Sequence, residues 1–396
     1  MHPAKDIEGV KSDKLAGKKI VLGVTGSIAA VETVKLAREL IRHGATVIPV
    51  MSKAATGIIG VESLHFATGI PPVTEITGNV EHVMYCGARP EKADLLLIAP
   101  ATGNTISKIA CGIDDTSVTT FATTAIGTGI PLLVVPAMHE TMYSHPVLKE
   151  NIGKLKKLGV NFVEPRISEH KAKFPEIEEI VANVIRLIGK RDYVGKKVLV
   201  IGGASYEPID EMRVLTNLST GKMSLAIARE AFLRGAEIDF LAGRIEVNLP
   251  PYIRITRFTT VEDLLAKLKK LDYDYIFVPA ALSDFTVDTK EGKLPSNREH
   301  RIVLKPLPKV LNHLRKRSRA LIVGFKAEPV AAEKQLINRA FAALKANDID
   351  FICANTLSNV GTETGEVFLI DKNGSATRIA GTKEKIAEKI FDLVRK

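Results

Sequence analysis

What this sequence lacks already narrows the class of protein to which it can belong. It has three cysteines with no CxxC pair among them, which argues against a disulfide framework and favours free thiols in a reducing compartment. No apolar run approaches the roughly 18 residues that a membrane span requires. The charged start MHPAKDIEGVKSDK has no apolar signal-peptide core. We therefore expect a cytoplasmic protein that does not bind a membrane.

The chain also lacks low-complexity segments, and it is too long for one ordinary core. Its 396 residues, 45% of them hydrophobic and 25% charged, predict two domains of about 200 residues, each with its own core. The net charge is +10, but the basic residues are scattered, with RKRSR at 315–319 the only dense cluster. We therefore favour an enzyme that handles phosphates over a protein that binds nucleic acid.

The two halves of the chain open with the same pattern. GKKIVLGVTG begins at Gly17 and GKKVLVIGGA begins at Gly195, while LARELIRHGA at 36–45 matches IAREAFLRGA at 227–236. The offset is 178 residues at the strand and 191 at the helix, so the second copy holds 13 extra residues, within ASYEPIDEMRVLTNLSTGKM. Because open α/β sheets bind ligands beyond the first strand, we expect one scaffold with two different reactions.

Further apolar runs alternate with amphipathic segments along the chain. The expected strands are ATVIPVM, ADLLLIAP, IPLLVVPA and VNFVE in the first half, and EIDFLAG, YDYIFVPA, ALIVGF, IDFICAN and EVFLID in the second. Strands that are apolar on both faces indicate parallel sheets covered by helices. We predict two doubly wound, Rossmann-like α/β domains, residues 1–190 and 191–396. Helices are expected to close each domain, over 176–189 and 382–396.

Three strand ends in the first half carry small or hydroxyl-bearing residues. GVTGSIAAVE lacks two of the three glycines of the dinucleotide fingerprint, so it is either a phosphate-binding turn that uses Ser27 and free N–H groups or a plain tight turn. Ser52 ends the next strand, and APATGNTISKIACG follows the third, with Asn104 or Thr105 as the expected helix N-cap. Because the three ends share one sheet edge, they favour a flat ligand with a phosphate tail.

Together these segments resemble the flavin-dependent cysteine decarboxylases. VTGSIAAVE, PATGNT and PAMHETMY of this sequence are similar to that family's phosphate loop, flavin segment and signature turn. The resemblance implies that the first domain is of this decarboxylase type and that its cofactor is FMN. The FMN contacts that it implies are Gly26, Ser27, Ile28, Ser52, Thr102, Asn104 and Thr105.

The resemblance also implies catalytic roles, and the sequence departs from the family at two of them. His82, in TGNVEHVMY, matches the catalytic histidine, which can pair with the leaving carboxylate or move protons; spacing alone does not single it out. The family's signature asparagine is His139 here, and EPRISEHKAKFPEIEE replaces its cysteine-bearing flap. We expect His139 to act on the substrate carboxylate, Lys171 or Lys173 to replace the flap, and Met142 to lie beside the substrate. The proton donor of the last step stays unassigned.

The segment PAMHETMYSHP, at 136–146, also invites comparison with a zinc site. An HExxH motif places its histidines four residues apart on one helical face, whereas His139 and His145 are six apart and Pro146 follows at once. The segment is better interpreted as a substrate-binding turn beside the flavin.

The second half contains GKM, which is suggestive of a P-loop. Thr216 and Met223 stand where that motif needs a glycine and a hydroxyl residue. GGASYEPIDEMRVLTNLSTGKMSLAIA instead resembles the phosphopantothenate-cysteine ligases, as do AALSDFTVDTKEGKLPS and VGFKAE followed by ICAN. The resemblance implies that CTP, with Mg²⁺ or Mn²⁺, activates the carboxylate of 4'-phosphopantothenate to an acyl-cytidylate. The amine of cysteine then displaces CMP.

Residue by residue, the ligase resemblance implies a second site. It implies Asn217 and Arg213 at the acyl-cytidylate, Asn217 and Lys293 as catalytic residues, and Asp284 as a metal ligand. The residues that it implies around the nucleotide are Ala280, Asp284, Lys293, Phe325 and Lys345. Lys293 is alternatively a solvated loop lysine, and the register at Lys345 is open by a residue or two.

The resemblance covers residues 15–396, with both halves in the order of the bifunctional enzymes of coenzyme A synthesis, of the archaeal type. It implies ligation followed by decarboxylation to 4'-phosphopantetheine. It further implies a homo-oligomer in which flavin domains form trimers and ligase domains form dimers, up to a dodecamer. Two alternatives stay open: a ligase with an inactive flavoprotein half, and a non-enzymatic regulator on the same scaffold.

Overall fold

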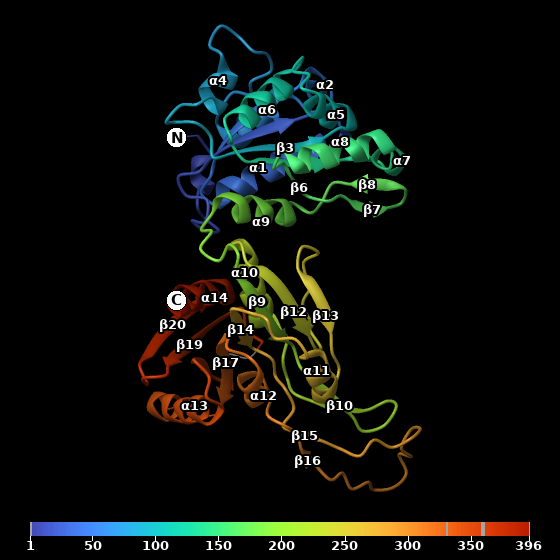
Figure 1. The fold of residues 1–396 in the computed structure, drawn as a ribbon, viewed down its shortest axis with the longest axis vertical. Helices are drawn as coiled ribbons and strands as arrows, with labels where there is room; N and C mark the ends of the chain where they lie inside the picture. The colour runs from blue at the N-terminus through green and yellow to red at the C-terminus, as the bar shows by residue number, and fades with distance from the viewer. Residues whose placement is uncertain (1, 330–331, 358–360, 396) are drawn as a thin grey trace. The chain divides into compact units, whose positions relative to one another are not determined.

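The computed structural model describes residues 2–329, 332–357 and 361–395 and divides the chain into two compact units, residues 1–191 and 192–396. Each unit has its own sheet and its own covering helices (Figure 1). None of the helices in the described residues has the length and hydropathy of a membrane span.

The first unit is built on a five-stranded parallel sheet in the order β2-β1-β3-β4-β6. Its strands are β1 (Lys19–Val24), β2 (Thr46–Met51), β3 (Leu95–Ala101), β4 (Leu132–Pro136) and β6 (Asn161–Phe162). The first four strands are apolar and almost wholly buried, as strands covered on both faces must be. The strand order reverses between β1 and β3, which places a ligand-binding crevice beyond the carboxyl ends of these two strands.

Helices cover both faces of the first sheet. One face packs in a single core with α5, α6 and α8, and on the other side α1 contacts both α3 and α9. The helical segments are η1 (Lys5–Ile7), η2 (Ile28–Glu32), α1 (Thr33–Arg42), α2 (Lys53–Thr56), α3 (Val61–Thr68), α4 (Glu81–Cys86), α5 (Gly103–Cys111), α6 (Ser117–Gly127), α7 (Glu140–Tyr143), α8 (Pro146–Lys157) and α9 (Ile177–Ile188). A separate antiparallel sheet, in the order β5-β8-β7, follows β4; its strands are β5 (Met138–His139), β7 (Arg166–Ser168) and β8 (Lys171–Lys173).

The second unit has an eight-stranded sheet in the order β13-β12-β9-β14-β17-β18-β19-β20. Its strands are β9 (Lys197–Gly202), β12 (Glu237–Ala242), β13 (Arg254–Arg257), β14 (Tyr275–Val278), β17 (Leu321–Glu328), β18 (Phe351–Thr356), β19 (Thr364–Asp371) and β20 (Ala376–Thr382). The order reverses between β9 and β14, so this sheet has a crevice equivalent to that of the first.

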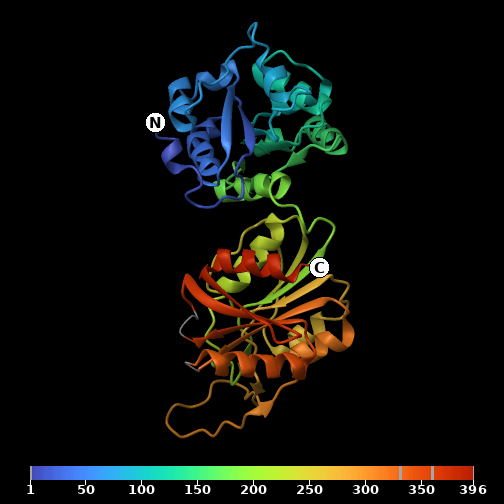
Figure 2. The same cartoon turned by 90° about the vertical axis from the view of Figure 1, so that its left-hand side faces the viewer.

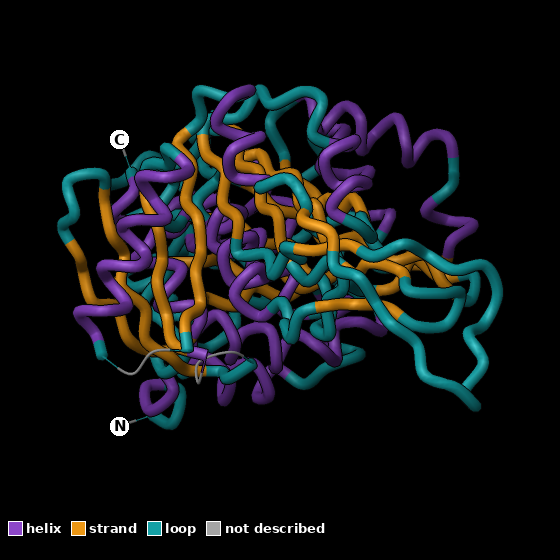
Figure 3. The backbone as a smooth tube through the Cα atoms, turned by 90° about the horizontal axis from the view of Figure 1, so that it is seen from below, coloured by secondary structure: helices purple, strands orange, loops and turns teal. Residues whose placement is uncertain are grey.

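The helices of the second unit lie in two layers. Figure 2 shows α13 and α14 on opposite faces of the sheet, and each face has its own hydrophobic core. The helices are α10 (Lys222–Leu233), α11 (Val261–Lys267), α12 (Val310–Arg317), α13 (Glu333–Asn347) and α14 (Lys383–Val394). Two short hairpins, β10 (Tyr206–Pro208) with β11 (Val214–Thr216) and β15 (Phe285–Thr286) with β16 (Lys305–Pro306), extend from this unit beside each other (Figures 1 and 3).

The predicted α/β class and the parallel cores of both sheets are confirmed, with one correction. EVFLID forms β19, which pairs antiparallel with β18, and β20 adds a further antiparallel strand. The sequence patterns missed β13 and β20 because both strands contain few buried apolar residues: β13 has none, and β20 buries only Ile379. The 13 extra residues of the second half lie between β9 and α10 and form the β10–β11 hairpin.

The internal repeat extends to how each unit holds its first helix. The N–H of Leu15 donates to the carbonyl of His43, 2.8 Å away, at the end of α1; the N–H of Tyr193 donates to the carbonyl of Arg234, 3.1 Å away, at the end of α10. His43 and Arg234 are equivalent positions, 191 residues apart. Both units therefore tie the segment before their first strand to the C-terminal end of their first helix.

The second unit strengthens this tie with a buried charge cluster. Arg234 is 2% exposed, and its guanidinium pairs with Glu230 at 2.8 Å, with Asp192 at 3.4 Å and with Asp392. The same guanidinium lies over the ring of Tyr193, whose hydroxyl donates to the Phe391 carbonyl. Because the charge of Arg234 is compensated on several sides, it can stay buried.

Candidate functional site

The strand ends of the first unit are bonded to one another at the crevice. The Thr25 hydroxyl donates to the Pro100 carbonyl at 2.8 Å and accepts from the N–H of Thr102 at 3.0 Å, which joins the ends of β1 and β3. Ser27 Oγ donates to the Ala137 carbonyl at 3.0 Å, which adds the end of β4. The expectation that these strand ends share one edge of the sheet is therefore correct. The hydroxyl of Ser27 already donates its proton to a backbone carbonyl of the same chain.

Two helices begin at this edge with side-chain caps. Ser52 is 7% exposed and caps α2 by accepting from the N–H of Ala55. Thr102, not Asn104 or Thr105, caps α5: its hydroxyl accepts from the N–H of Thr105 at 3.2 Å. The expected N-cap was wrong because the helix begins two residues earlier, at Gly103, so that Asn104 is exposed within its first turn.

The residues at this edge fit the phosphate and ring of a flavin nucleotide. A Cβ at Gly26 would meet the Cβ of Ala54 at 2.5 Å, so only glycine lets the turn lie this close to α2. The N-terminal turns of η2 and α5 supply backbone N–H groups where an anion binds, and Ile28 is 77% exposed beside them. Backbone donors with an exposed apolar side chain suit a phosphate joined to a flat ring.

His82 lies on α4, away from these strand ends. The C-terminal end of α4 is held where strands begin, because Thr128 Oγ1 donates to the Cys86 carbonyl at 2.7 Å and the N–H of Ala93 donates to the Tyr85 carbonyl just before β3. In Figure 1, α4 lies at the opposite end of the unit from α2, α5 and α7. His82 Nδ1 is buried and has no hydrogen-bond partner within the described residues. Within one chain, the structure therefore does not bring His82 to the crevice.

The segment after β4 supplies the predicted residues His139 and Met142, and it also contains Tyr143. Met142 is 51% exposed, whereas Tyr143 is buried and its hydroxyl donates to Glu164 at 2.6 Å. Burial, with the bond to Glu164, raises the pKa of Tyr143, so its hydroxyl stays protonated and joins the turn to Glu164. His139 is exposed at the end of β5.

The replaced flap forms the β7–β8 hairpin, which pairs with β5. His139 lies directly opposite Lys171, which lies opposite Ser168, so the three side chains share one face of the small sheet. Lys173 is on the same face, and its ammonium pairs with Glu169 at 2.8 Å. The hairpin therefore presents His139 and Lys171 together, with Lys173 already paired within the turn.

The three cysteines do not restore the missing flap thiol. Cys86 and Cys353 are buried, and burial raises the pKa of Cys86 to about 12 and that of Cys353 further. Cys111 is exposed at the end of α5, one full helix from the crevice. A different group must therefore donate the proton that the family's cysteine is expected to supply.

The second unit contains a cavity of about 640 Å³ at the carboxyl ends of β14, β17 and β18. Its walls come from residues 217–224 at the start of α10, residues 279–282 after β14, Phe325 to Ala327 of β17, and Asn355 of β18. Gly221 has φ +79°, and a Cβ there would meet Ile245 at 2.9 Å, so the turn into α10 requires glycine. The cavity thus occupies the crevice that the strand order predicts.

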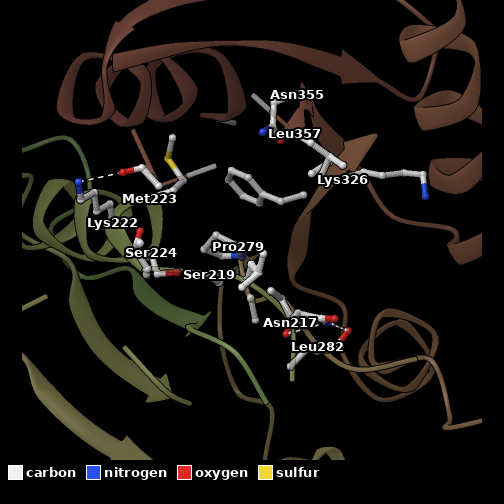
Figure 4. Close-up of a pocket in the computed structure, with 18 of the residues that line it drawn as sticks. Asn217, Ser219, Lys222, Met223, Ser224, Pro279, Leu282, Lys326, Asn355 and Leu357 are labelled. Atoms are coloured by element: carbon white, nitrogen blue, oxygen red, sulfur yellow. Dashed lines mark hydrogen bonds between the residues drawn. The ribbon is translucent and has the colours of Figure 1, made fainter. Parts of the chain in front are cut away.

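Four of the predicted ligase residues line this cavity: Asn217, Ala280, Asp284 and Phe325. The amide of Asn217 donates to the carbonyls of Ala281 and Leu282 at 3.3 and 3.0 Å, and Figure 4 shows this pair at the opposite side from Lys222. The Asp284 carboxylate is 63% exposed and accepts from the ammonium of Lys309 at 2.5 Å. Three chain segments far apart in sequence therefore meet at one cavity.

Cations that the sequence patterns did not single out also line the cavity. Lys222 donates to the Gly361 carbonyl at 2.9 Å and pairs with Glu363; Lys383 is only 7% exposed. Burial, and then the charge of Lys222, lowers the pKa of Lys383. Lys326 also lines the cavity, although its side chain extends away from Met223 and Pro279 in Figure 4. The GKM segment could have drawn attention to Lys222. No local sequence pattern points to Lys383, which is the first residue of α14.

The other predicted ligase residues lie outside this cavity. Arg213 and Lys293 are exposed on the two projecting loops. Lys345 is in the last turn of α13, with its ammonium 4.4 Å from the ring centroid of Phe341. α13 leads into the start of β18, so Lys345 lies at the sheet edge where strands begin, opposite the edge that holds the cavity.

No group of three or more His, Cys, Asp or Glu side chains placed to hold a metal ion occurs within the described ranges. Asp284 is a single carboxylate at the cavity, and Mg²⁺ in nucleotide enzymes is commonly held by one or two carboxylates and the substrate's phosphates. Asp284 fits that mode of binding.

Comparison with known proteins places both units. Residues 8–189 match the family model described as Flavoprotein, and residues 193–396 match the model described as DNA/pantothenate metabolism flavoprotein C-terminal domain. The chain is 48% identical over its full length to the coenzyme A biosynthesis bifunctional protein CoaBC of Thermococcus kodakarensis, covering 99% of it. It is 42% identical to the CoaBC protein of Methanocaldococcus jannaschii, over all of this chain and 98% of that protein. A crystal structure titled FMN-dependent cysteine decarboxylase SpaF matches 44% of this chain and 98% of its own, at 28% identity and a TM-score of 0.39.

Proposed function

We infer, from the premise that this chain belongs to the family of coenzyme A biosynthesis bifunctional proteins CoaBC, that it catalyses two successive reactions. The second unit joins cysteine to 4'-phosphopantothenate, and the first unit decarboxylates the product to 4'-phosphopantetheine. The observation that carries the proposal is the cavity of the second unit, where Asn217, Ala280, Asp284 and Phe325 converge from separate segments.

The ligation begins with attack of a carboxylate oxygen of 4'-phosphopantothenate on the α-phosphorus of CTP. Pyrophosphate leaves, and the cysteine amine then attacks the acyl carbon, loses a proton and displaces CMP. Asn217 is held by its two carbonyl partners, which fixes its side chain at the wall of the cavity where the acyl-cytidylate would lie. Lys222 and Lys383 raise the positive potential at the other end, and a phosphate there would relieve their mutual repulsion. Asp284 would hold Mg²⁺ together with the phosphates.

The decarboxylation uses FMN, which the first unit would hold at the ends of β1, β2 and β3. FMN supplies the two-electron oxidation and reduction that make the carboxylate next to the substrate's C–S bond easy to lose. The backbone N–H groups of the Gly26 turn would bind its phosphate, and Ser52, Thr102, Asn104 and Thr105 lie along the same edge. The match to the Flavoprotein family supports this assignment.

His139 and Lys171 are our proposal for the group that binds the substrate's carboxylate. They lie opposite each other across β5 and β8, so their Cβ atoms are about 5 Å apart, which lets both reach one carboxylate. Lys173 is paired with Glu169, whereas Lys171 has no ion pair with any residue in the part of the chain that the structure describes. Lys171 is therefore the stronger replacement for the flap.

Because His82 lies at the opposite end of the unit from the crevice, we propose that a second copy of the chain completes the flavin site. A ring of copies would bring α4 of one chain to the strand ends of the next, as the trimer expected for the flavin domain requires. The projecting hairpins of the second unit carry exposed apolar residues, Met212 at 71% and Val303 at 69% among them, which suits a dimer of ligase units. Light scattering on the purified protein measures the assembly.

One assay tests the whole proposal. The purified protein receives 4'-phosphopantothenate, CTP, Mg²⁺ and cysteine, and the products are read by mass spectrometry. Product that has lost CO₂ supports both reactions, whereas accumulation of 4'-phosphopantothenoylcysteine shows a ligase with an inactive flavin unit. No ligation product with CTP or ATP would contradict the ligase activity, and no loss of CO₂ from supplied 4'-phosphopantothenoylcysteine would contradict the decarboxylase activity. A flavin absorbance band in the isolated or FMN-loaded protein tests the cofactor separately.

A further inference from the structure

Two loops of the second unit are bound together outside the cavity. The first loop runs from Pro208, the last residue of β10, to Arg213, and the second, residues 288–294, follows β15 and carries Lys293. The N–H of Lys290 donates to the Ile209 carbonyl at 2.9 Å, and the Thr289 hydroxyl donates to the Pro208 carbonyl at 3.0 Å. Although these loops are some 80 residues apart in sequence (Glu211 and Gly292 differ by 81), they form one paired strap.

A single carboxylate joins the two loops at the level of Arg213 and Lys293. Asp210 is 2% exposed, and its Oδ1 accepts from the N–H groups of Met212 at 2.8 Å and Arg213 at 2.7 Å. Its Oδ2 accepts from the guanidinium of Arg213 and, at 3.0 Å, from the N–H of Leu294, the residue after Lys293. Arg213 also donates to the Leu294 carbonyl at 3.3 Å. One buried carboxylate thus bonds the side chain of one predicted active-site cation and the backbone next to the other.

Local folding explains only half of this arrangement. An aspartate that accepts from the N–H groups two and three residues later forms an ordinary Asx turn, and Met212 and Arg213 satisfy that pattern. The bonds from Leu294 and from the Arg213 guanidinium are additional and long-range. The N–H of Leu294 in particular, opposed by burial, holds the pKa of Asp210 well below its usual range, so the carboxylate stays charged at neutral pH.

We propose that Asp210 is a positioning residue of the ligase site, which presents Arg213 and Lys293 as a pair of fixed spacing to the substrate phosphates and the acyl-cytidylate. This proposal rests on the proposed ligation in the second unit. Arg213 is four residues of extended chain from Asn217, about 13 Å at ~3.3 Å per residue. If the two loops paired differently, Arg213 and Lys293 would both move relative to the cavity.

The test uses the full-length, FMN-loaded protein and a double-mutant cycle. Asp210→Asn, Arg213→Gln and the double variant are compared with wild type in steady-state ligation, with kcat and the KM for CTP measured separately. Loss of charge-assisted hydrogen bonds predicts that Asp210→Asn lowers kcat at least about 10-fold. If Asp210 acts through Arg213, the double variant is no slower than the slower single variant, within about two-fold.

Glu207→Gln is the matched control. Glu207 is equally buried, at 3% exposure, and accepts from the N–H of Val261 at 3.0 Å and the hydroxyl of Thr286, so it joins different segments of the same region. We expect its kcat to stay within about three-fold of wild type, since hydrogen bonds that are not at the site are felt mainly in stability.

The possible outcomes separate this proposal from the proposed function. Wild-type protein that makes no ligation product contradicts the function itself. If wild type ligates but Asp210→Asn keeps its kcat within two-fold, or if the two single losses multiply, Asp210 has no positioning role. Should Asp210→Asn fail to fold, hydrogen exchange on wild type decides: the amides of Met212 and Leu294 must be protected and exchange at one common rate, and independent rates would overturn the proposal.

Discussion

The two units hold their scaffolds alike and differ at the edge where chemistry takes place. At the edge where strands begin, Asp94 accepts from the backbone N–H of Lys19 at 2.9 Å, and Asp274 does the same for Lys197 at 2.8 Å. The preceding residue of each pair, Lys18 or Lys196, adds an ion pair to the same carboxylate. These bonds fix where the first strand enters its sheet, whatever follows at its other end.

The difference lies in the connection between first strand and first helix. In the first unit, the connection after β1 is short: Thr25 and Ser27 bond to the ends of β3 and β4, and η2 begins at Ile28. In the second unit, 13 extra residues build the β10–β11 hairpin and one wall of a 640 Å³ cavity. The comparison teaches that an insertion at one loop can build a cavity at the edge of a sheet without altering the scaffold.

The comparison treats the two sites as independent, and the largest expected effect tests that independence. His82→Asn is expected to lower decarboxylation of supplied 4'-phosphopantothenoylcysteine by about 10³-fold, the usual contribution of a general acid or base. Ligation by the same protein should be unchanged, since His82 belongs to the first unit. Mass spectrometry of both products measures this. His65→Asn, a half-buried histidine of α3, is the control, and loss of both activities in His82→Asn would contradict separate sites.

The reciprocal change addresses the second unit. Asn217→Ala removes the amide that is fixed on the Ala281 and Leu282 carbonyls, and we expect ligation to fall by about 10²-fold, as for other preorganised amides. Decarboxylation of supplied substrate should continue at the wild-type rate. Asn347→Ala, which removes an amide bonded within α13, should keep both rates. Unimpaired ligation in Asn217→Ala would remove this residue from the site.

A smaller effect is expected at the hairpin that extends the first site. Lys171→Ala removes the cation opposite His139 and should raise the KM for 4'-phosphopantothenoylcysteine by about 10-fold, the value of one charge-assisted hydrogen bond, with a smaller change in kcat. Lys157→Ala, an exposed lysine at the end of α8, is the matched control. An unchanged KM in Lys171→Ala would assign carboxylate binding to a residue outside the hairpin.

The smallest expected effect concerns the shared scaffold and pH. Burial lowers the pKa of His43, against the opposing charge of Glu39, whereas its counterpart Arg234 does not titrate. The unfolded chain takes up a proton at a pKa near 6.5 that folded His43 resists, so the first unit should lose stability as pH falls below about 6.5. Hydrogen exchange at pH 7.5 and 5.5, corrected for intrinsic rates, should show protection falling in α1 more than in α10. His43→Gln should abolish that difference.

Much of the fold was predictable because its signals are local. The apolar runs that became the central strands carry their own burial pattern, and the repeated GKK and Arg-Glu segments reveal two related scaffolds. The β7–β8 hairpin was not foreseen as a hairpin, because its turn is Glu169 and His170, both at positive φ of 51° and 55°, instead of the Asn-Gly that such turns favour. Its pairing with β5 supports a conformation that the two residues disfavour.

The candidate sites were predictable where a motif spans a strand end and not where the site depends on distant segments. Asn217 and Ala280 follow strand ends, and both line the cavity. Lys383 could not be found, because it enters the cavity from the start of the last helix, 161 residues after Lys222. Asp210 was part of a recognised segment, but its bond to Leu294 joins loops whose pairing no sequence spacing reveals.

The tie between Tyr193 and Phe391 has a consequence for the order in which the chain matures on the ribosome. The hydroxyl of Tyr193, at the entry to the second unit, donates to a carbonyl 198 residues later, and the neighbouring Arg234 is compensated in part by Asp392. The first unit has all of its sequence once residue 191 is made, so it can fold while synthesis continues. The second unit must wait for its final helix, and during that interval the apolar faces of its central strands are open to solvent and to chaperones.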